Sequence, residues 1–399
     1  MALLAILFCV LAFCAMACTR PDVPHSAATA MVRVEWDDVP ELVDDKSLDS
    51  LVRSLENSRR YYRKVSGSRS FTFGPDSYTA DWLDTSMAVF IKLAEKCESP
   101  EEFVTRLRRS FVVYRSVGRD NEGGMLFTGY YEPVLKGSRE RTGKYRFPLY
   151  RLPDDIYTVD LGRFSEQWEG KKLLARVEGR AVLPYHDRRA IDREEALAGR
   201  NLEIVWLEDP VSAFFLHIQG SGRVVFPDGT WIHAHYAGVN GRPYRSVGRL
   251  LIDEGKVTRE KMSMQAIRRY LEDNPEDMAR VMDYNESYVF FEEEDEGPLG
   301  CLDVPLTPGR SVATDRRLFP EGAIVYIRSR KPVVDAEGQI MEWTGFGRFA
   351  ANQDTGGAIR GPGRLDLFWG RGDYAEIAAG HMKHPGELYF FVLDPEAAH

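Results

Sequence analysis

Residues 352–370 read NQDTGGAIRGPGRLDLFWG and carry two carboxylates, Asp354 and Asp366, twelve positions apart. Asp366 stands in an otherwise apolar run, LDLFW. Because neighbouring side chains of a strand point to opposite faces, Leu365 and Leu367 would share one face and Asp366 would occupy the other. A carboxylate among apolar groups keeps its proton to a higher pH, which is what a general acid needs at neutral pH. The stretch therefore predicts a strand that presents one working acid, with the rest of the chain as its scaffold.

The composition of the chain sets limits on that scaffold. The chain has 399 residues, of which 44% are apolar and 12% aromatic, so it can bury a sizeable core, and its length favours two domains. The net charge is -9 and the pI is about 5.6. A phosphate backbone binds proteins that carry a surplus of Lys and Arg, so nucleic acid is not expected as a partner.

The N-terminus resembles a bacterial secretion leader. Residues 3–17 form an apolar run that is short for a membrane span, and the run ends in Ala-Met-Ala before Cys18. Small residues before a cysteine resemble a lipobox, in which the cysteine receives lipid after cleavage. We therefore expect a lipoprotein signal peptide over residues 1–18, lipid attachment at Cys18, and a small, polar tether over residues 19–32. An ordinary cleaved secretory signal is the alternative.

Three segments in the first third of the chain have the apolar spacing of helices. The first is residues 47–65, with Ser47 as its expected N-cap, and the second is residues 81–97. The third begins with the capping box SPEE at residues 99–102, which places Pro at the first helical position. Cys97 falls on the apolar face of the second helix, so we expect a buried free thiol there.

From residue 125 onward the signals are mostly those of short strands and turns. Segments such as MLFTGYYEPVL, YRFPLYRL and AFFLHIQGSGRVVF have the composition of strands in a barrel or sandwich. Helices are expected at residues 263–271 and after Asn274-Pro275, and a short one at residues 374–379 that Asp373 would cap. The last hundred residues are again rich in strands. The fold class is therefore mainly β with accessory helices, an α+β protein.

Several short motifs have simpler explanations than a binding site. The glycine-rich segment at residues 356–363 lacks the Lys and Ser/Thr of a P-loop. The triplet DTG at residues 354–356 resembles that of aspartic proteases, but those enzymes need a second such triplet, and the chain has no other. Two pairs of closely spaced histidines have no carboxylate at ligand spacing, so no metal is expected.

The carboxylates leave two kinds of chemistry open. Glycosidases usually use two carboxylates, and Asp354 and Asp366 are candidates for such a pair, with Asp315 as a third. The sequence does not give their separation. If only one of them points into a groove, the reaction requires a single group that acts first as acid and then as base.

Four ordered segments carry a family resemblance. They are GYYEP at 129–133, FFLHIQGSGRV at 214–224, YAGVNGRPYRSVGRLLIDEG at 236–255 and SMQAI at 263–267. Together they resemble the membrane-bound lytic murein transglycosylase A family, and the C-terminal part resembles its "3D" domain, named for three aspartates. Those aspartates match Asp315, Asp354 and Asp366, and the resemblance runs from about residue 32 to residue 393.

This resemblance implies a two-domain architecture. A double-psi β-barrel domain would be built from residues 33–131 and 295–396, with the 3D motif within 300–395. A second, barrel-like β domain at residues 132–294 would be inserted into it. A deep groove between the two would bind the glycan strand of peptidoglycan. The enzyme would act as a monomer without a cofactor, cleave the β-1,4 bond between N-acetylmuramic acid (MurNAc) and N-acetylglucosamine (GlcNAc), and leave a 1,6-anhydromuramoyl end.

The resemblance also assigns roles to single residues. Asp366 matches the catalytic acid/base, and Asp354 and Asp315 would orient the site or tune Asp366. Sugar contacts are expected from Thr128, Gly129, Tyr130, Tyr131, Gln219, Ser221 and Tyr236. The leader and the family imply an outer-membrane lipoprotein that faces the periplasm. Two other functions stay open, which are a peptidoglycan-binding lipoprotein without catalysis and a hydrolytic muramidase that uses a carboxylate pair.

Overall fold

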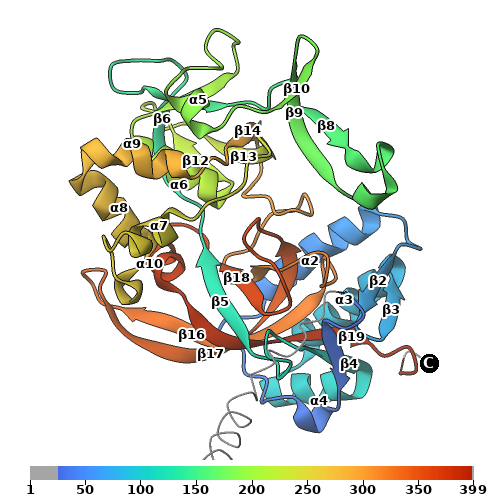
Figure 1. Ribbon diagram of the computed structural model, residues 1–399. Coiled ribbons are helices and arrows are strands. Elements are labelled where there is room, and N and C mark those ends of the chain that lie inside the picture. The colour runs from blue at the N-terminus through green and yellow to red at the C-terminus, as the bar shows by residue number, and fades with distance from the viewer. Residues whose placement is uncertain (1–25, 398–399) are drawn as a thin grey trace, which may run out of the picture.

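The computed structural model describes residues 26–397, and the leader with Cys18 lies outside them. The chain forms two β bodies, one above the other in Figure 1. The lower one, the barrel body, takes its strands from both ends of the chain, whereas the upper one, the inserted body, takes them from the middle. The predicted fold class, mainly β with accessory helices, is confirmed.

The sheet of the barrel body has the strand order β1-β4-β19-β16-β17-β15-β18-β5. Because β19 also pairs with β5, the strands from β19 round to β5 close into a ring. The strands are β1 (Met31–Val34), β4 (Phe111–Ser116), β5 (Met125–Tyr130), β15 (Ser311–Ala313), β16 (Ile324–Val334), β17 (Ile340–Asp354), β18 (Arg364–Phe368) and β19 (His384–Leu393). Closure leaves no free edge next to β18, the strand that carries Asp366.

Helices and a small hairpin cover the outside of the barrel. They are α2 (Asp49–Lys64), α3 (Ala80–Lys96), α4 (Pro100–Ser110), α10 (Asp373–His381), β2 (Ser70–Phe73) and β3 (Asp76–Thr79). Phe90 of α3, Phe103 of α4 and Phe349 of β17 meet edge to face, with ring centroids 5.3–5.7 Å apart. These aromatic contacts join the N-terminal helices to the wall of the barrel in one core.

The inserted body is built on a sheet of order β14-β13-β12-β6-β11-β7, and a separate arm has the order β10-β9-β8. Its elements are β6 (Val134–Ser138), β7 (Phe147–Tyr150), β8 (Tyr157–Asp160), β9 (Lys172–Glu178), β10 (Ala181–Pro184), α5 (Arg188–Asp192), β11 (Glu203–Leu207), α6 (Pro210–Gln219), β12 (Gly222–Val225), β13 (Trp231–Val239), α7 (Val247–Asp253), α8 (Met264–Asp273), α9 (Pro275–Tyr284) and β14 (Val289–Glu294). The edge strands β14 and β7 approach each other, which gives the sheet a barrel-like curl.

Helix α6 corrects the prediction of strands for the AFFLHIQ segment. Asp209 caps it by accepting the N–H groups of Val211 and Ser212, Pro210 takes the first turn, and Gly220 ends it at φ 82°. The helix is buried on nearly all sides, so its apolar residues are consecutive and lack the 3.6-residue period. The short helices α5 and α7 also lie in the region where only strands and turns were expected.

The predicted helices of the first third are present, and one cap is confirmed. Ser99 accepts the N–H of Glu102 at the start of α4, as the capping box predicts. The cap of α2 is Leu48 rather than Ser47, whose hydroxyl binds the Asp49 carboxylate instead. The cap of α10 is Gly372, so the prediction for Asp373 was also wrong by one position.

Two further expectations about single segments differ from the structure. Ala30 and Met31 are already buried against the barrel, so the predicted tether ends before residue 32. Cys97 is a free thiol as predicted, but it is only half-buried, because it follows the last turn of α3. Cys301, the other described cysteine, is also free and half-buried.

Candidate active site

Four adjacent strands of the barrel place two carboxylates in one row. In the register of the sheet, Ala313 of β15 pairs with Asp354 on one side and with Asp366 on the other, and Asp366 pairs with Thr128 of β5. Directly paired residues project from the same face of a sheet. The row therefore runs Asp354, Ala313, Asp366, Thr128, and the two aspartates lie about 10 Å apart at their Cα atoms, which is two strand spacings.

A β-bulge turns Asp354 into this row. Val312 pairs with Asn352 but Ala313 pairs with Asp354, so Gln353 is the extra residue. The Gln353 side chain is fully buried, where it donates to the Ser54 carbonyl at 2.7 Å and accepts from Ser311 at 2.6 Å. Gln353 thus anchors β17 to α2. Because successive side chains of a strand alternate, Asp354 points to the opposite face of β17, which is the face of the row.

Asp366 has the alternation that the sequence predicts. Leu365 and Leu367 are fully buried on one face of β18, while the Asp366 side chain on the other face keeps 21% of its exposure. Thr128 donates a hydrogen bond to Asp366, and Arg364 Nη2 lies 3.0 Å from the Thr128 hydroxyl and 3.6 Å from Asp366 Oδ1. Burial raises the pKa of Asp366 to about 6, against the lowering effect of Arg364.

Asp354 is the more tightly held of the two carboxylates. Its Oδ2 accepts the Tyr130 hydroxyl at 2.8 Å, and its Oδ1 accepts the backbone N–H groups of Cys301 at 3.0 Å and Thr355 at 2.8 Å. Burial still raises the pKa of Asp354 to about 6, although these three hydrogen bonds lower it. The ring of Tyr130 packs on Phe368, with centroids 5.2 Å apart, so the donor is itself fixed.

Asp315 stands apart from this row. Its carboxylate is buried and binds Arg317 through two hydrogen bonds of 2.9 and 2.6 Å, and it accepts the Gly361 N–H at 2.9 Å. Although burial acts to raise the pKa of Asp315, these donors lower it to about 2. None of its described hydrogen bonds or ion pairs reaches Asp354 or Asp366. Asp315 therefore braces the glycine-rich loop that connects β17 to β18.

Several of the residues predicted to contact sugar are occupied by structural contacts. Tyr131 is 7% exposed and lies in the barrel core. Gln219 accepts the Tyr131 N–H at 3.4 Å and donates to the Met264 sulfur at 3.2 Å. At Gly129 a Cβ would lie 2.6 Å from the indole nitrogen of Trp369, so this glycine is required by packing.

The other predicted sugar contacts differ in their surroundings. Tyr236 is 44% exposed on β13, and Ser221 is half-buried in the turn after α6. Thr128 and Tyr130 bind the two aspartates of the row. Sequence reasoning missed Arg364, although its position two residues before Asp366 on one strand places both side chains on the same face.

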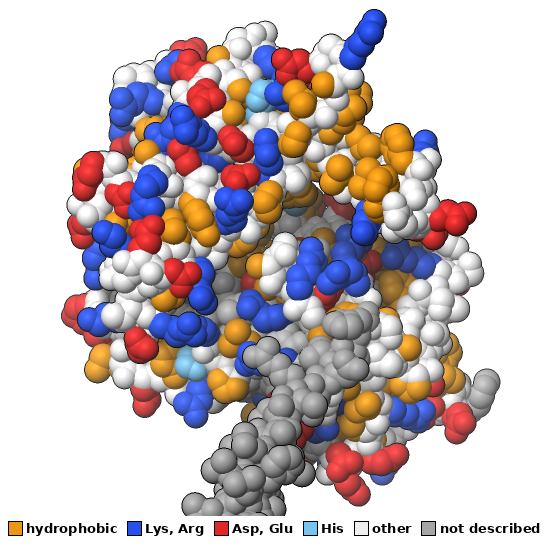
Figure 2. All heavy atoms as spheres, viewed as in Figure 1, with side chains coloured by type: hydrophobic (Ala, Val, Ile, Leu, Met, Phe, Trp, Pro, Cys, Tyr) orange, Lys and Arg blue, Asp and Glu red, His pale blue; other side chains and the backbone are white. Residues whose placement is uncertain are grey.

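In Figure 1, β5 and β18 lie below the inserted body. Figure 2 shows the molecular face hollowed between the bodies, with Lys and Arg side chains gathered at its lower edge.

In the described part of the chain, no three potential metal ligands gather, and His233 instead lies 2.8 Å from the Glu132 carboxylate. No helix within residues 26–397 is long and apolar enough to cross a membrane.

Comparisons with known proteins agree with this architecture. Residues 126–292 match the model of the MltA specific insert domain, and residues 310–392 match that of the 3D domain. The membrane-bound lytic murein transglycosylase A of Vibrio cholerae is 34% identical over 282 residues, which cover 69% of this chain and 68% of that protein. The protein of the same name from Escherichia coli K12 is 32% identical over 301 residues, covering 73% of each chain.

Solved structures are also similar over nearly the whole chain. A membrane-bound lytic murein transglycosylase from Agrobacterium tumefaciens is 30% identical with a TM-score of 0.75, covering 92% of this chain and 99% of its own. E. coli MltA with bound chitohexaose is 25% identical with a TM-score of 0.69, covering 94% of this chain and 98% of its own. The closed barrel, the inserted sheet and these matches together show that the chain belongs to the membrane-bound lytic murein transglycosylase A family.

Proposed function

We propose that this chain is a peptidoglycan lytic transglycosylase that cleaves the β-1,4 bond between MurNAc and GlcNAc, with Asp366 as its only acid/base. The observation that carries the proposal is the contrast between the two carboxylates of the row. Asp354 accepts hydrogen bonds from three donors, whereas Asp366 is bound only at one edge, by Thr128 and Arg364, and its side chain is 21% exposed. A carboxyl group of this kind can give up a proton and take one back.

The reaction needs no second catalytic carboxylate. Asp366 donates its proton to the glycosidic oxygen, the bond to C1 of the muramyl residue breaks, and GlcNAc leaves with that proton. The C6 hydroxyl of the same muramyl residue then attacks C1, and the Asp366 carboxylate takes the hydroxyl proton. No water is consumed, and the product carries a 1,6-anhydro bridge. Since the nucleophile belongs to the substrate, orientation in the groove replaces a bound water.

The neighbours of Asp366 have defined parts in this scheme. After proton donation, the Arg364 guanidinium at 3.6 Å stabilises the carboxylate, and the Thr128 hydroxyl keeps its orientation. Asp354 places a second carboxylate on the far side of Ala313, where its negative charge raises the pKa of Asp366 further. We assign Asp354 and Tyr130 as positioning residues, and Asp315 as a brace of the loop.

The binding of a glycan is supported by a relative. E. coli MltA has been solved with bound chitohexaose, and its chain matches 94% of this one. We propose that the hollow between the bodies binds the glycan strands of peptidoglycan, with the exposed Tyr236 and the half-buried Ser221 as sugar contacts on the inserted body.

The location of the protein is part of the proposal. The relatives are named membrane-bound, and residues 15–18 resemble a lipobox. We propose that the signal peptide is removed, that Cys18 carries lipid, and that the enzyme is held at the outer membrane and faces the periplasm. Cys18→Ser should abolish the incorporation of labelled fatty acid. Labelling that persists in this variant would exclude Cys18 as the attachment site.

The decisive test is the mass of the product. Purified sacculi digested with the wild-type protein should release muropeptides that are one water lighter than hydrolysis products, and Asp366→Asn should release none while remaining folded. Asp373→Asn, which changes an exposed aspartate outside the row, is the matched control and should retain activity. Release of reducing-end products would favour a hydrolytic muramidase. Binding to sacculi without any release by the wild-type protein would favour a non-catalytic wall-binding protein.

A further inference from the structure

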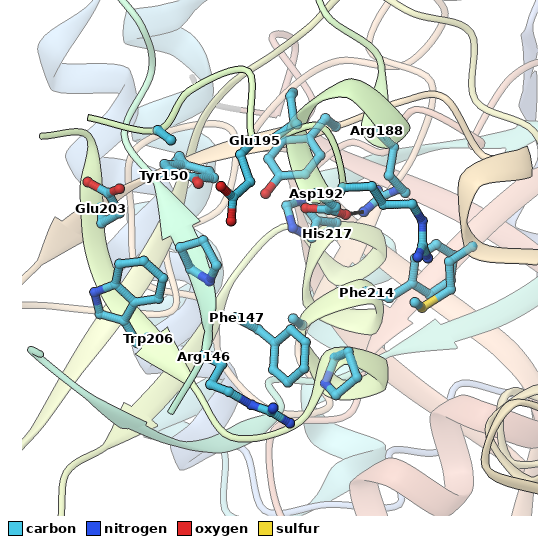
Figure 3. A pocket seen from close by; sticks show the side chains of 18 of the residues that line it. Arg146, Phe147, Tyr150, Arg188, Asp192, Glu195, Glu203, Trp206, Phe214 and His217 are labelled. Atoms are coloured by element: carbon cyan, nitrogen blue, oxygen red, sulfur yellow. Dashed lines mark hydrogen bonds and ion pairs between the residues drawn. The ribbon is translucent and has the colours of Figure 1, made fainter. Parts of the chain in front are cut away.

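The inserted body contains a cavity of about 600 Å3 that is distinct from the row on the barrel. It opens among β7, β11, α5, α6 and α9, in the upper part of Figure 1, whereas β18 lies below. Figure 3 shows its lining side chains, and its volume is within the usual range of small-ligand sites. Nothing in the proposed reaction uses this cavity.

The floor of the cavity is buried and mostly aromatic. Tyr150, Phe214 and Tyr288 are between 0% and 4% exposed, and His217 is 8% exposed. The Tyr288 hydroxyl has no hydrogen-bond partner of normal geometry among the described residues, although the Asp192 carboxylate lies beside it. His217 accepts the Val289 N–H through Nδ1, so burial, which keeps the ring neutral, leaves the proton on Nε2 as a donor. Buried polar groups of this kind favour a polar ligand.

Arg188 is built into the floor and does not require a ligand. It is 1% exposed, donates to the carbonyls of Asn285 at 3.0 Å and Ser287 at 2.6 Å, and stacks on Phe214 and Tyr288. Its remaining charge is balanced by Asp192, 3.5 Å away. The charges of the floor therefore balance each other, and the unpaired charges lie at the rim.

The rim carries unpaired charges of both signs. Glu195 and Glu203 form no ion pair or hydrogen bond through their carboxylates within residues 26–397, and Figure 3 shows Glu195 directed into the cavity. Arg141 and Arg146 also lack a carboxylate partner there. Instead, Arg141 stacks on Trp206 at 5.3 Å, and Arg146 lies over Phe147 at 5.7 Å. Stacking orients each guanidinium while leaving its donors available.

We infer that this cavity is a binding site for a zwitterionic peptide group, with Glu195 and Glu203 holding its ammonium and Arg141 and Arg146 holding its carboxylate. Two unpaired carboxylates and two aromatic-stacked guanidinium groups that line the same cavity complement a ligand that carries both charges, and the aromatic floor receives its apolar part. The inference rests on the proposed function for its ligand, because the muramyl residues of peptidoglycan carry short peptide stems whose diamino acid has a free side-chain ammonium and which also carry free carboxylates. The inserted body thus binds a stem while the barrel acts on the glycan.

Calorimetric titration of the purified full chain tests this inference. The probe is disaccharide muropeptides with intact stems, released from sacculi by a muramidase and compared with the same muropeptides acetylated at their amines, with stem-free glycan oligomers and with free lysine. We expect saturable binding of the stems and at least about tenfold weaker binding after acetylation, since a charge-assisted contact is lost. Free lysine that binds as tightly as the stems would identify a site for free amino acids and overturn the assignment to the wall.

Single substitutions test whether the stems bind in this cavity. Glu195→Gln and Glu203→Gln should each weaken stem binding by about tenfold, whereas Glu194→Gln should leave it unchanged, because Glu194 pairs with Arg189 outside the cavity. Equal binding by all three variants would refute the site. Asp366→Asn separates the two proposals, because it should abolish cleavage but not stem binding. Stem binding without any anhydro product from the wild type would refute the proposed function and leave the cavity site standing.

Discussion

The row on the barrel and the cavity in the inserted body both combine carboxylates with buried aromatic rings, but they hold the carboxylates differently. Asp354 and Asp366 project from β17 and β18, which lie on either side of β15 in a closed ring, and are bound by named donors. Glu195 and Glu203 stand at a rim without partners among the described residues. A carboxylate fixed on strands can have its pKa set for proton transfer, whereas an unpaired one at a rim is available to bind a ligand.

Replacement of Asp366 should have the largest effect and is the strongest test of the difference between the two regions. Asp366→Asn should lower the rate of anhydromuropeptide release from sacculi by at least about 1000-fold, because in the proposed reaction one group supplies both proton transfers.

In the wild type, the rate should fall as the pH rises through about 6, where Asp366 loses its proton. Arg364→Met should move that fall to higher pH, because Arg364 lowers the pKa of Asp366. A pH profile that is unchanged in Arg364→Met would contradict the assignment of the titrating group.

Removal of one donor from Asp354 should have a smaller effect. Tyr130→Phe deletes the 2.8 Å hydrogen bond and should slow release by about 10- to 100-fold, the value of one charge-assisted hydrogen bond. The ring and its packing on Phe368 remain, so the melting temperature should change little. The rate is measured on sacculi at a fixed pH, with Tyr157→Phe, at an exposed position of β8 on the inserted body, as a control. A wild-type rate in Tyr130→Phe would mean that Asp354 only holds the turn.

The raised pKa of Asp366 should also change how the stability of the protein depends on pH. The folded pKa of Asp366, about 6, is above the unfolded value of about 3.9, so the folded state binds more protons between these values. The free energy of unfolding therefore decreases as the pH rises through this window. From about pH 4 to about pH 8, Asp366→Asn should gain about 1–2 kcal/mol relative to wild type, allowing for solvent at this 21% exposed side chain. Urea unfolding at both pH values measures the gain, and a constant difference would refute it.

The rim carboxylates should show the smallest effect. Glu195→Gln removes a charge that makes no ion pair within residues 26–397, so neither the melting temperature nor its pH dependence should change measurably. Thermal melts of this variant beside Asp366→Asn would show the contrast directly. Destabilisation by Glu195→Gln would mean that the Glu195 charge stabilises the fold. The proposed difference between the two regions would then not hold.

Local signals predicted much of this molecule. The cap at Ser99 and the alternation around Asp366 each depend on a few neighbouring residues, and both are present. Helix α6 was missed because burial on nearly all sides removes its period. The row of Asp354 and Asp366 was beyond prediction, because it depends on a bulge and on pairing between strands far apart in sequence.

The pairing of β5 with β18 also makes the site mechanically sensitive. Beyond Thr128, the chain stays bound to the end of β18 through Tyr130 O and Trp369 N at 2.9 Å and through the Glu132 N–H and the Gly370 carbonyl at 2.7 Å, and it then enters the inserted body. A tilt of the inserted body therefore pulls on the strand that holds Thr128 against Asp366. In the proposed reaction, tension in a glycan bound to both bodies would act on the contact between Thr128 and Asp366.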